Sequence, residues 1–202
     1  RVERSLLSYE RSAWAEEAAE TLRREERRPA AERGPMLCCL DTSRSMAGRR
    51  EAVAKAALLE VLRQAQAQRR PAWVCAFSGA GELQEMSVPP GPVRADAADP
   101  VLRFLAGSFG GGTDLAAPLA RGLELAGGAR FRDADLLLVT DGEVPQPPER
   151  VLELLATLRR ERGLRLFGLL IRGDGASEDP PSVLPALCDE WQRFEALGRV
   201  PL

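Results

Sequence analysis

The chain contains no histidine and a single lysine, Lys55, among its 202 residues. Without histidine it cannot form a Ser-His-Asp or Cys-His nucleophilic centre, because both need an imidazole as the base. Zinc and iron sites with histidine ligands are excluded for the same reason. Any chemistry in this chain must therefore use carboxylates, hydroxyls, arginines or thiols.

Cysteines are also few, and they do not form a C-x-x-C arrangement. Cys38, Cys39 and Cys75 lie in apolar runs, and Cys188 lies in a late apolar stretch. We interpret all four as reduced core residues, which favours a cytoplasmic location. A metal site built on these thiols is the weaker alternative at this spacing.

Long apolar runs and an excess of one charge are missing as well. No segment has the length and apolarity of a membrane span or a signal peptide. The 30 acidic and 28 basic residues give a net charge of −2, which argues against a nucleic-acid-binding surface. We therefore expect neither a membrane nor a nucleic acid as the partner. Because the first residue is Arg1, we expect the chain to be part of a longer protein.

The order of the predicted elements indicates an α/β fold. Residues 1–33 form an arginine-rich leader with a short strand or helix and a linker, and residues 34–202 form the main domain. Strands are expected at 36–40, 72–77, 82–88, 135–140 and 164–171, helices at 53–62, 101–105, 115–125 and 149–162, and a final helix–strand pair through 194. This alternation predicts a Rossmann-like, doubly wound, mostly parallel sheet with helices on both faces and one antiparallel edge strand. Trp14, Trp73 and Trp191 are expected in the core or at an interface.

Carboxylates and hydroxyls follow the predicted strands. Two buried strands end at Asp41 and Asp141, and Ser43 and Ser45 come directly after the first of them. A glycine loop places another hydroxyl, Thr113, just before a helix. Ligand sites of open α/β sheets lie beyond the carboxyl ends of the strands. Two carboxylates and three hydroxyls at one point would suit Mg²⁺, with Mn²⁺ or Ca²⁺ as alternatives.

These residues resemble a known family pattern. The order D-x-S-x-S, a distant threonine and a distant aspartate is similar to the metal-ion-dependent adhesion site of von Willebrand factor A (VWA) domains. The resemblance covers about residues 34–196. It implies the VWA fold, the five metal ligands Asp41, Ser43, Ser45, Thr113 and Asp141, and a non-enzymatic role in which the metal docks a partner's glutamate or aspartate. Arg44 departs from the pattern, because glycine is commonest there, and a side chain at this position affects ligand access.

A narrower resemblance concerns the segments around that site. Gly34-Pro35, the run 39–43, Phe77-Ser78 and the run 109–115 look like bacterial VWA proteins that work with MoxR-type AAA+ ATPases. The leader segment 5–9 is similar as well. The resemblance implies an adaptor or co-chaperone role, with a MoxR-like ATPase or its client as the partner. In such proteins the VWA domain is typically C-terminal.

Simpler structural roles compete with these interpretations. Asp41 and Asp141 could only cap the turns after their strands, and Ser43 and Ser45 could cap a helix. Asp114 could complement a helix dipole, or it could contact the metal ligands without binding the metal itself. A structural alternative is that the metal site is vestigial and the domain packs against the rest of its own chain.

Two other functions remain as alternatives. The glycine loop could cradle a phosphate at a helix N-terminus, although it lacks the Lys-Ser/Thr ending of a P-loop and Lys55 lies elsewhere. Asp41 could instead be the nucleophile of a metal-assisted phosphohydrolase similar to the haloacid dehalogenase family. That family has a second aspartate where this chain has Ser43.

Overall fold

The computed structural model describes residues 34–91, 95–173 and 183–195. The leader and its linker, including Trp14, lie outside the described residues. Within them, no helix is both long and apolar enough to cross a membrane.

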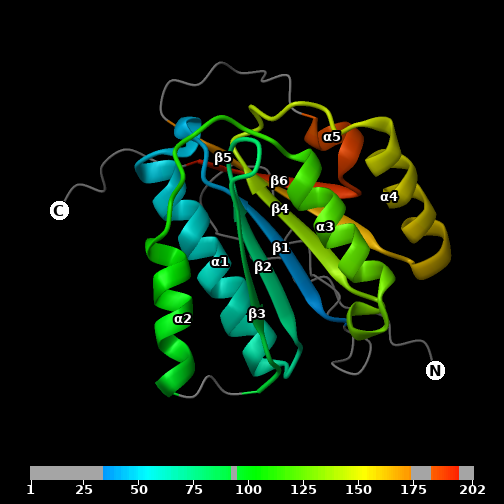
Figure 1. The fold of residues 1–202 in the computed structure, drawn as a ribbon, viewed down its shortest axis with the longest axis horizontal. Coiled ribbons are helices and arrows are strands. Elements are labelled where there is room, and N and C mark those ends of the chain that lie inside the picture. Colours follow the sequence, from blue (N-terminus) through cyan, green and yellow to red (C-terminus); the bar gives the residue numbers. More distant parts are fainter. Residues whose placement is uncertain (1–33, 92–94, 174–182, 196–202) are drawn as a thin grey trace, which may run out of the picture.

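Six strands of the described chain form one sheet, in the order β3-β2-β1-β4-β5-β6 (Figure 1). Their bounds are β1 Met36–Asp41, β2 Ala72–Phe77, β3 Leu83–Val88, β4 Asp135–Thr140, β5 Arg165–Arg172 and β6 Glu190–Glu195. All neighbouring strands are parallel except β2 and β3, which are antiparallel. The predicted mostly parallel sheet with one antiparallel edge strand is confirmed.

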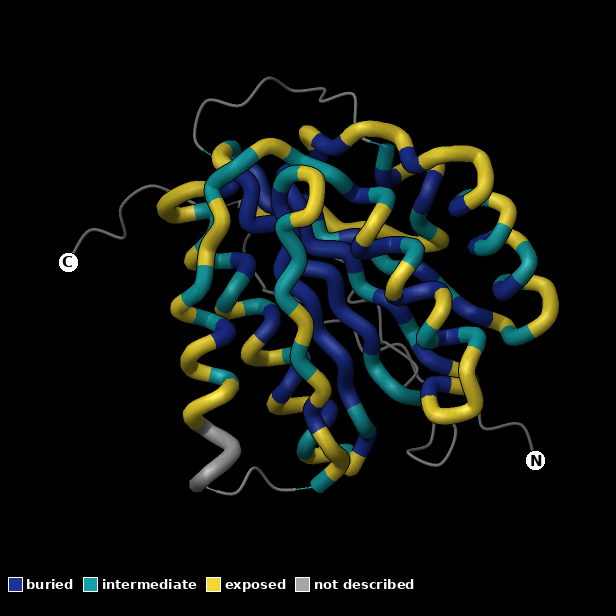
Figure 2. Tube along the Cα trace, viewed as in Figure 1, coloured by how far each residue is buried: buried dark blue, intermediate teal, exposed yellow. Residues whose placement is uncertain are grey.

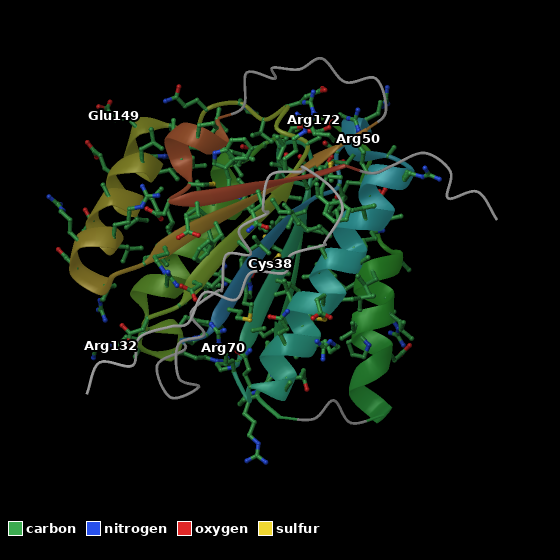
Figure 3. The ribbon with its side chains drawn as sticks, turned by 180° about the vertical axis from the view of Figure 1, so that it is seen from behind. Cys38, Arg50, Arg70, Arg132, Glu149 and Arg172 are labelled. Atoms are coloured by element: carbon green, nitrogen blue, oxygen red, sulfur yellow. The ribbon has the colours of Figure 1, made fainter. Side chains whose placement is uncertain are left out.

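Helices cover both faces of this sheet. They are α1 Arg49–Ala67, α2 Ala95–Ala106, α3 Ala116–Gly127, α4 Glu149–Arg162 and α5 Leu184–Leu187. The helices α1 and α2 lie on one face, and α3, α4 and α5 lie on the other (Figures 1 and 3). Successive side chains of a strand point to opposite faces, so β1 contributes to two apolar clusters. Cys38 and Leu40 pack with Leu58 of α1, whereas Leu37 and Cys39 pack in the cluster of α3 and α4.

Burial explains why these segments form central strands. Every residue of β2 is buried, and so is all of β1 except Met36 (Figure 2). Burying one leucine-sized side chain contributes about 1.5–3 kcal/mol, so continuous apolar runs are stable only between two layers of helices. At the edge, β3 is buried only at Val88, in agreement with its more polar sequence.

The extent of one predicted helix needs correction. The helix predicted at 101–105 is α2, which spans Ala95–Ala106 and contains Pro100. Proline disfavours a helix interior because it lacks the N–H donor. Burial of Phe104, one turn later, in the apolar cluster that contains Leu58 of α1 stabilises the helix nevertheless. Trp73 is buried in the core, and Trp191, expected in the core or at an interface, is 44% exposed. It lies on β6, an edge strand that pairs with β5 among the described strands.

The cysteines occupy the positions expected for core residues. All four are free, with Cys38, Cys39 and Cys75 buried. Cys188 is half-buried against the apolar cluster of α3 and α4. No group of three or more cysteine, aspartate or glutamate side chains within the described residues is arranged to hold a metal. Within the described residues, the thiols thus do not form such a group.

Candidate metal site at the carboxyl edge of the sheet

Asp41 and Asp141 lie side by side at the tips of two neighbouring parallel strands. The pairing of Leu40 with Val139 places Asp41 at the end of β1 and Asp141 directly after β4. In each residue, Oδ1 accepts a hydrogen bond from the backbone N–H two residues further on. The donors are Ser43, at 2.9 Å, and Glu143, at 3.0 Å. The simple turn-capping role is therefore real, but it uses one oxygen of each carboxylate.

The second oxygens have different partners. Oδ2 of Asp41 accepts a hydrogen bond from the Thr140 hydroxyl at 2.7 Å, inside the protein. Oδ2 of Asp141 accepts one from the guanidinium of Arg50 at 3.0 Å. The same Nη1 of Arg50 also donates to the backbone oxygen of Ser45 at 2.9 Å. The Arg50 guanidinium therefore links Asp141, directly after β4, to the serine loop, residues 43–45 after β1.

The serine hydroxyls face each other. Ser43 Oγ and Ser45 Oγ are 3.1 Å apart. Ser45 lies in the short 3-10 helix η2, Arg44–Met46, and Ser43 directly precedes it. Ser43 is the N-cap of this turn but makes no side-chain capping bond, and the N-cap of α1 is Gly48. Helix capping therefore does not account for either hydroxyl. The Arg44 side chain is exposed.

The glycine loop is attached to the serine loop by backbone hydrogen bonds. Gly110 N–H donates to Thr42 O, and Arg44 N–H donates to Gly111 O, each at 3.0 Å. From the other side, the Ser78 hydroxyl accepts from Gly111 N–H at 2.9 Å and donates to Gly112 O at 2.8 Å. These bonds fix the loop that carries Thr113 beside the serine loop.

Two of the loop glycines are constrained in different ways. Gly110 has φ = 65°, a left-handed conformation that L side chains rarely adopt. A Cβ on Gly111 would lie 2.3 Å from Glu82 Oε2, so the end of that side chain would have to move, and 3.2 Å from the Ser78 hydroxyl. Gly112 is different, because nothing lies within 4 Å of a Cβ placed there. A side chain would thus strain the backbone at residue 110 and crowd Ser78 and Glu82 at residue 111.

Several backbone N–H groups of the glycine loop are already used within the protein. Backbone N–H groups of Gly110, Gly111, Asp114 and Ala116 already have partners within the protein. The last of these bonds goes to Asp114 Oδ1 at 2.9 Å, so Asp114 stabilises the start of α3. Thr113 is half-buried, and its hydroxyl has no hydrogen-bond partner among the described residues. Its oxygen is therefore available to an external group.

Burial makes the paired carboxylates electrostatically costly. Asp41 is fully buried and 2% of Asp141 is exposed. Burial raises the pKa of Asp41 above its usual value, hydrogen bonds from Ser43 and Thr140 lower it, and the negative charge of Asp141 raises it further. A cation between these groups would offset both the desolvation and the repulsion. The donors are hard oxygens, which suits Mg²⁺.

The structure thus places Asp41, Ser43, Ser45 and Asp141 in one hydrogen-bonded cluster and attaches the loop of Thr113 to it. Sequence reasoning missed Thr140, Arg50 and the positioning role of Ser78. A hydroxyl directly before Asp141 was a usable signal for Thr140. Nothing in the sequence distinguishes Arg50 from the many other arginines.

Comparison with known proteins identifies the family of this chain. A family model described as the von Willebrand factor type A domain matches residues 36–143. Regulatory protein ViaA of Edwardsiella ictaluri (strain 93-146) is 32% identical over 200 residues. The match covers 96% of this chain but 38% of that protein, so the chain spans well under half of this relative.

Solved structures are similar in fold. A von Willebrand factor type A protein from Catenulispora acidiphila superposes with a TM-score of 0.60 at 16% identity, over 80% of this chain and 38% of that one. Proximal thread matrix protein 1 from the mussel byssus was solved with zinc in its metal-ion-dependent adhesion site (MIDAS) motif. It superposes with a TM-score of 0.55 at 15% identity, over 81% of this chain and 44% of that one. At these identities the similarity establishes the fold.

Proposed function

The chain belongs to the von Willebrand factor type A family, and we propose from this premise that it is a divalent-metal-dependent protein-binding module. Asp41, Ser43, Ser45, Thr113 and Asp141 would hold Mg²⁺, directly or through water. A bound Mg²⁺ supplies a positive centre with an open coordination position for a carboxylate. The partner would provide that carboxylate from an aspartate or glutamate side chain.

One observation carries this proposal: two buried carboxylates and a pair of facing hydroxyls meet at one edge of the sheet. The protein already places a cationic guanidinium on Asp141 Oδ2, so this oxygen faces a position that suits positive charge. The hydroxyls of Ser43, Ser45 and Thr113 are not used for helix capping, which leaves their oxygens available as ligands.

We propose further that the partner is a MoxR-type AAA+ ATPase or a client presented to it, with the chain as adaptor or co-chaperone. The segments 39–43 and 109–115 support this through their resemblance to VWA proteins of that group. The similarity to a regulatory protein supports a role exerted on another protein. The relative is much longer than this chain, so its remaining part can contribute to partner binding.

A phosphohydrolase is the competing function, with Asp41 as its nucleophile. The residue pattern disfavours it, because the haloacid dehalogenase family has a second aspartate two residues after the nucleophile, where this chain has Ser43. Phosphate release from a chromogenic ester in Mg²⁺, lost in Asp41→Asn, would favour the enzyme and contradict the binding module.

The partner proposal can be tested by affinity capture with the purified MoxR-type ATPase of the source organism. Wild type should bind in Mg²⁺ and lose binding in EDTA, and Asp41→Asn should not bind in either. Glu143→Gln is the matched control, because it removes an exposed carboxylate at the same sheet edge. Equal binding of all samples would contradict metal-dependent docking and favour a vestigial site. If this ATPase does not bind but another protein is captured in a metal-dependent manner, only the partner assignment is overturned.

A further inference from the structure

Arg50 lies within the candidate metal site, although it is not one of the proposed ligands. It is the second residue of α1 and reaches back from the helix to the sheet edge (Figure 3). Its Nη1 bridges Asp141 Oδ2, at 3.0 Å, and Ser45 O, at 2.9 Å. A quarter of the Arg50 side chain is exposed, against 2% of Asp141. The contact is therefore at the mouth of the site, with one partner buried.

The position of Arg50 is restricted on its other side as well. A Cβ placed on Gly173, directly after β5, would lie 2.7 Å from Arg50 Nε. The guanidinium therefore packs closely against backbone and against Asp141, and it is not a loosely held surface group. Surface ion pairs contribute little to stability, but a pair with a buried carboxylate is less screened by solvent and salt.

Formal charges show what this arrangement does. Asp41, Asp141 and Arg50 together carry −1, and a divalent ion would bring the site to +1. If glutamine replaced Arg50, the site would carry −2 alone and zero with the ion. The guanidinium thus opposes the metal electrostatically and occupies the Asp141 oxygen that the metal would use. The same positive charge favours an incoming carboxylate once the metal is present.

We propose that Arg50 couples metal binding to carboxylate docking. It competes with the metal for Asp141, and after displacement it remains at the mouth through Ser45 O and adds its charge to the docking position. Arg50 is thus a positioning residue that weakens metal binding alone and strengthens binding of the metal together with an acidic group. This inference rests on the metal site proposed above.

The test is a titration of the full chain with Mn²⁺, followed by electron paramagnetic resonance of the free ion. Arg50→Gln should bind Mn²⁺ at least about tenfold more tightly than wild type, because a nearby positive charge is removed. Arg49→Gln is the matched control: it removes the same charge from the neighbouring, exposed position. Its effect should be clearly smaller. Equal or weaker binding by Arg50→Gln would overturn the proposal.

The coupling is measured by replacing sodium chloride with sodium acetate at equal ionic strength. Acetate should tighten Mn²⁺ binding by wild type more than it tightens Mn²⁺ binding by Arg50→Gln. Without acetate the order is reversed, because Arg50→Gln is then expected to bind Mn²⁺ more tightly than wild type. A general loss of structure would weaken both. Equal effects of acetate on the two chains would overturn the docking part of the inference.

If Arg50→Gln does not fold, the competition is read from wild type itself. The NMR signal of the Arg50 guanidinium, assigned with Arg50→Lys, should shift and exchange faster with water as Mg²⁺ is added. An unchanged signal at metal saturation would contradict displacement. Absence of Mn²⁺ binding by wild type, Arg50→Gln and Arg49→Gln alike would instead overturn the metal site itself, and this inference with it.

Discussion

Asp41 and Asp141 end neighbouring parallel strands, and each uses Oδ1 to accept the backbone N–H two residues further on. Their second oxygens differ, because Thr140 donates to Asp41 whereas Arg50 donates to Asp141. A neutral hydroxyl holds one carboxylate and a cation holds the other. In the proposed metal site, Asp141 would therefore be the ligand that exchanges a partner when the metal binds, and Asp41 would keep its hydrogen bond from Thr140.

Metal should stabilise the folded chain, because the assembled oxygens exist only in the folded state. At a concentration 100 times the dissociation constant, a ligand of the native state contributes about 2.7 kcal/mol. We expect MgCl₂ to raise the melting temperature of wild type and of Glu143→Gln, measured by circular dichroism. Asp41→Asn should show no increase. An equal increase in all three chains would indicate a general salt effect and contradict specific binding.

The hydroxyl of Thr140 should be important for stability. It donates to Asp41 Oδ2 and accepts from Gly142 N–H at 3.2 Å, and the residue is fully buried. Thr140→Val leaves a buried carboxylate oxygen without its donor, which should lower the free energy of unfolding by about 1–3 kcal/mol. Urea denaturation measures this loss. Thr140→Ser keeps the hydroxyl and should recover most of it; a serine variant as unstable as the valine one would refute the role of the hydrogen bond.

Neighbouring glycines of the loop should respond differently to alanine. Gly111→Ala places a Cβ 2.3 Å from Glu82 Oε2, which must move, and 3.2 Å from the Ser78 hydroxyl, whose hydrogen bonds hold the loop. Gly112→Ala meets no atom within 4 Å. We therefore expect Gly111→Ala to weaken Mg²⁺ binding, measured by calorimetry, and Gly112→Ala to bind like wild type. Identical affinities for the two variants would show that the loop contact does not position Thr113.

Cysteine reactivity gives a test that depends on pH. Burial raises the pKa of the Cys188 thiol to about 12, and the thiolate is the nucleophile. The rate of alkylation by iodoacetamide should therefore still rise at pH 10, where an ordinary thiol of pKa about 8.5 has levelled off. The fully buried Cys38, Cys39 and Cys75 should react only after unfolding. Cys188→Ser should abolish alkylation of the folded protein. An alkylation rate that reaches a plateau near pH 9 would contradict the raised pKa.

Much of this molecule follows from local sequence. Continuous apolar runs predict β1, β2 and β4, and the abrupt change to aspartate places Asp41 and Asp141 at one edge of the sheet. The extent of α2 was missed because Pro100 argues against a helix, while burial of Phe104 stabilises one. Exposure of Trp191 depends on β6 being an edge strand, which strand order alone determines.

The contacts within the site were less predictable. Residue types identified the five proposed ligands, but the role of Arg50 depends on how α1 is set against the ends of β4 and β5. That placement results from the packing of Leu58 and its neighbours in the core. Ser78 is similar, since its two bonds to the glycine loop join the residue directly after β2 to a segment more than 30 residues away.

The position of a bound metal ion can be measured by anomalous scattering. Crystals of the chain grown with MnCl₂ should show one strong anomalous peak at the carboxyl edge of the sheet. The ion should be bound by oxygens of Asp41, Ser43, Ser45, Thr113 and Asp141, directly or through water, with the Arg50 guanidinium moved off Asp141. A peak elsewhere, or none at saturating Mn²⁺, would show that these residues do not form a metal site.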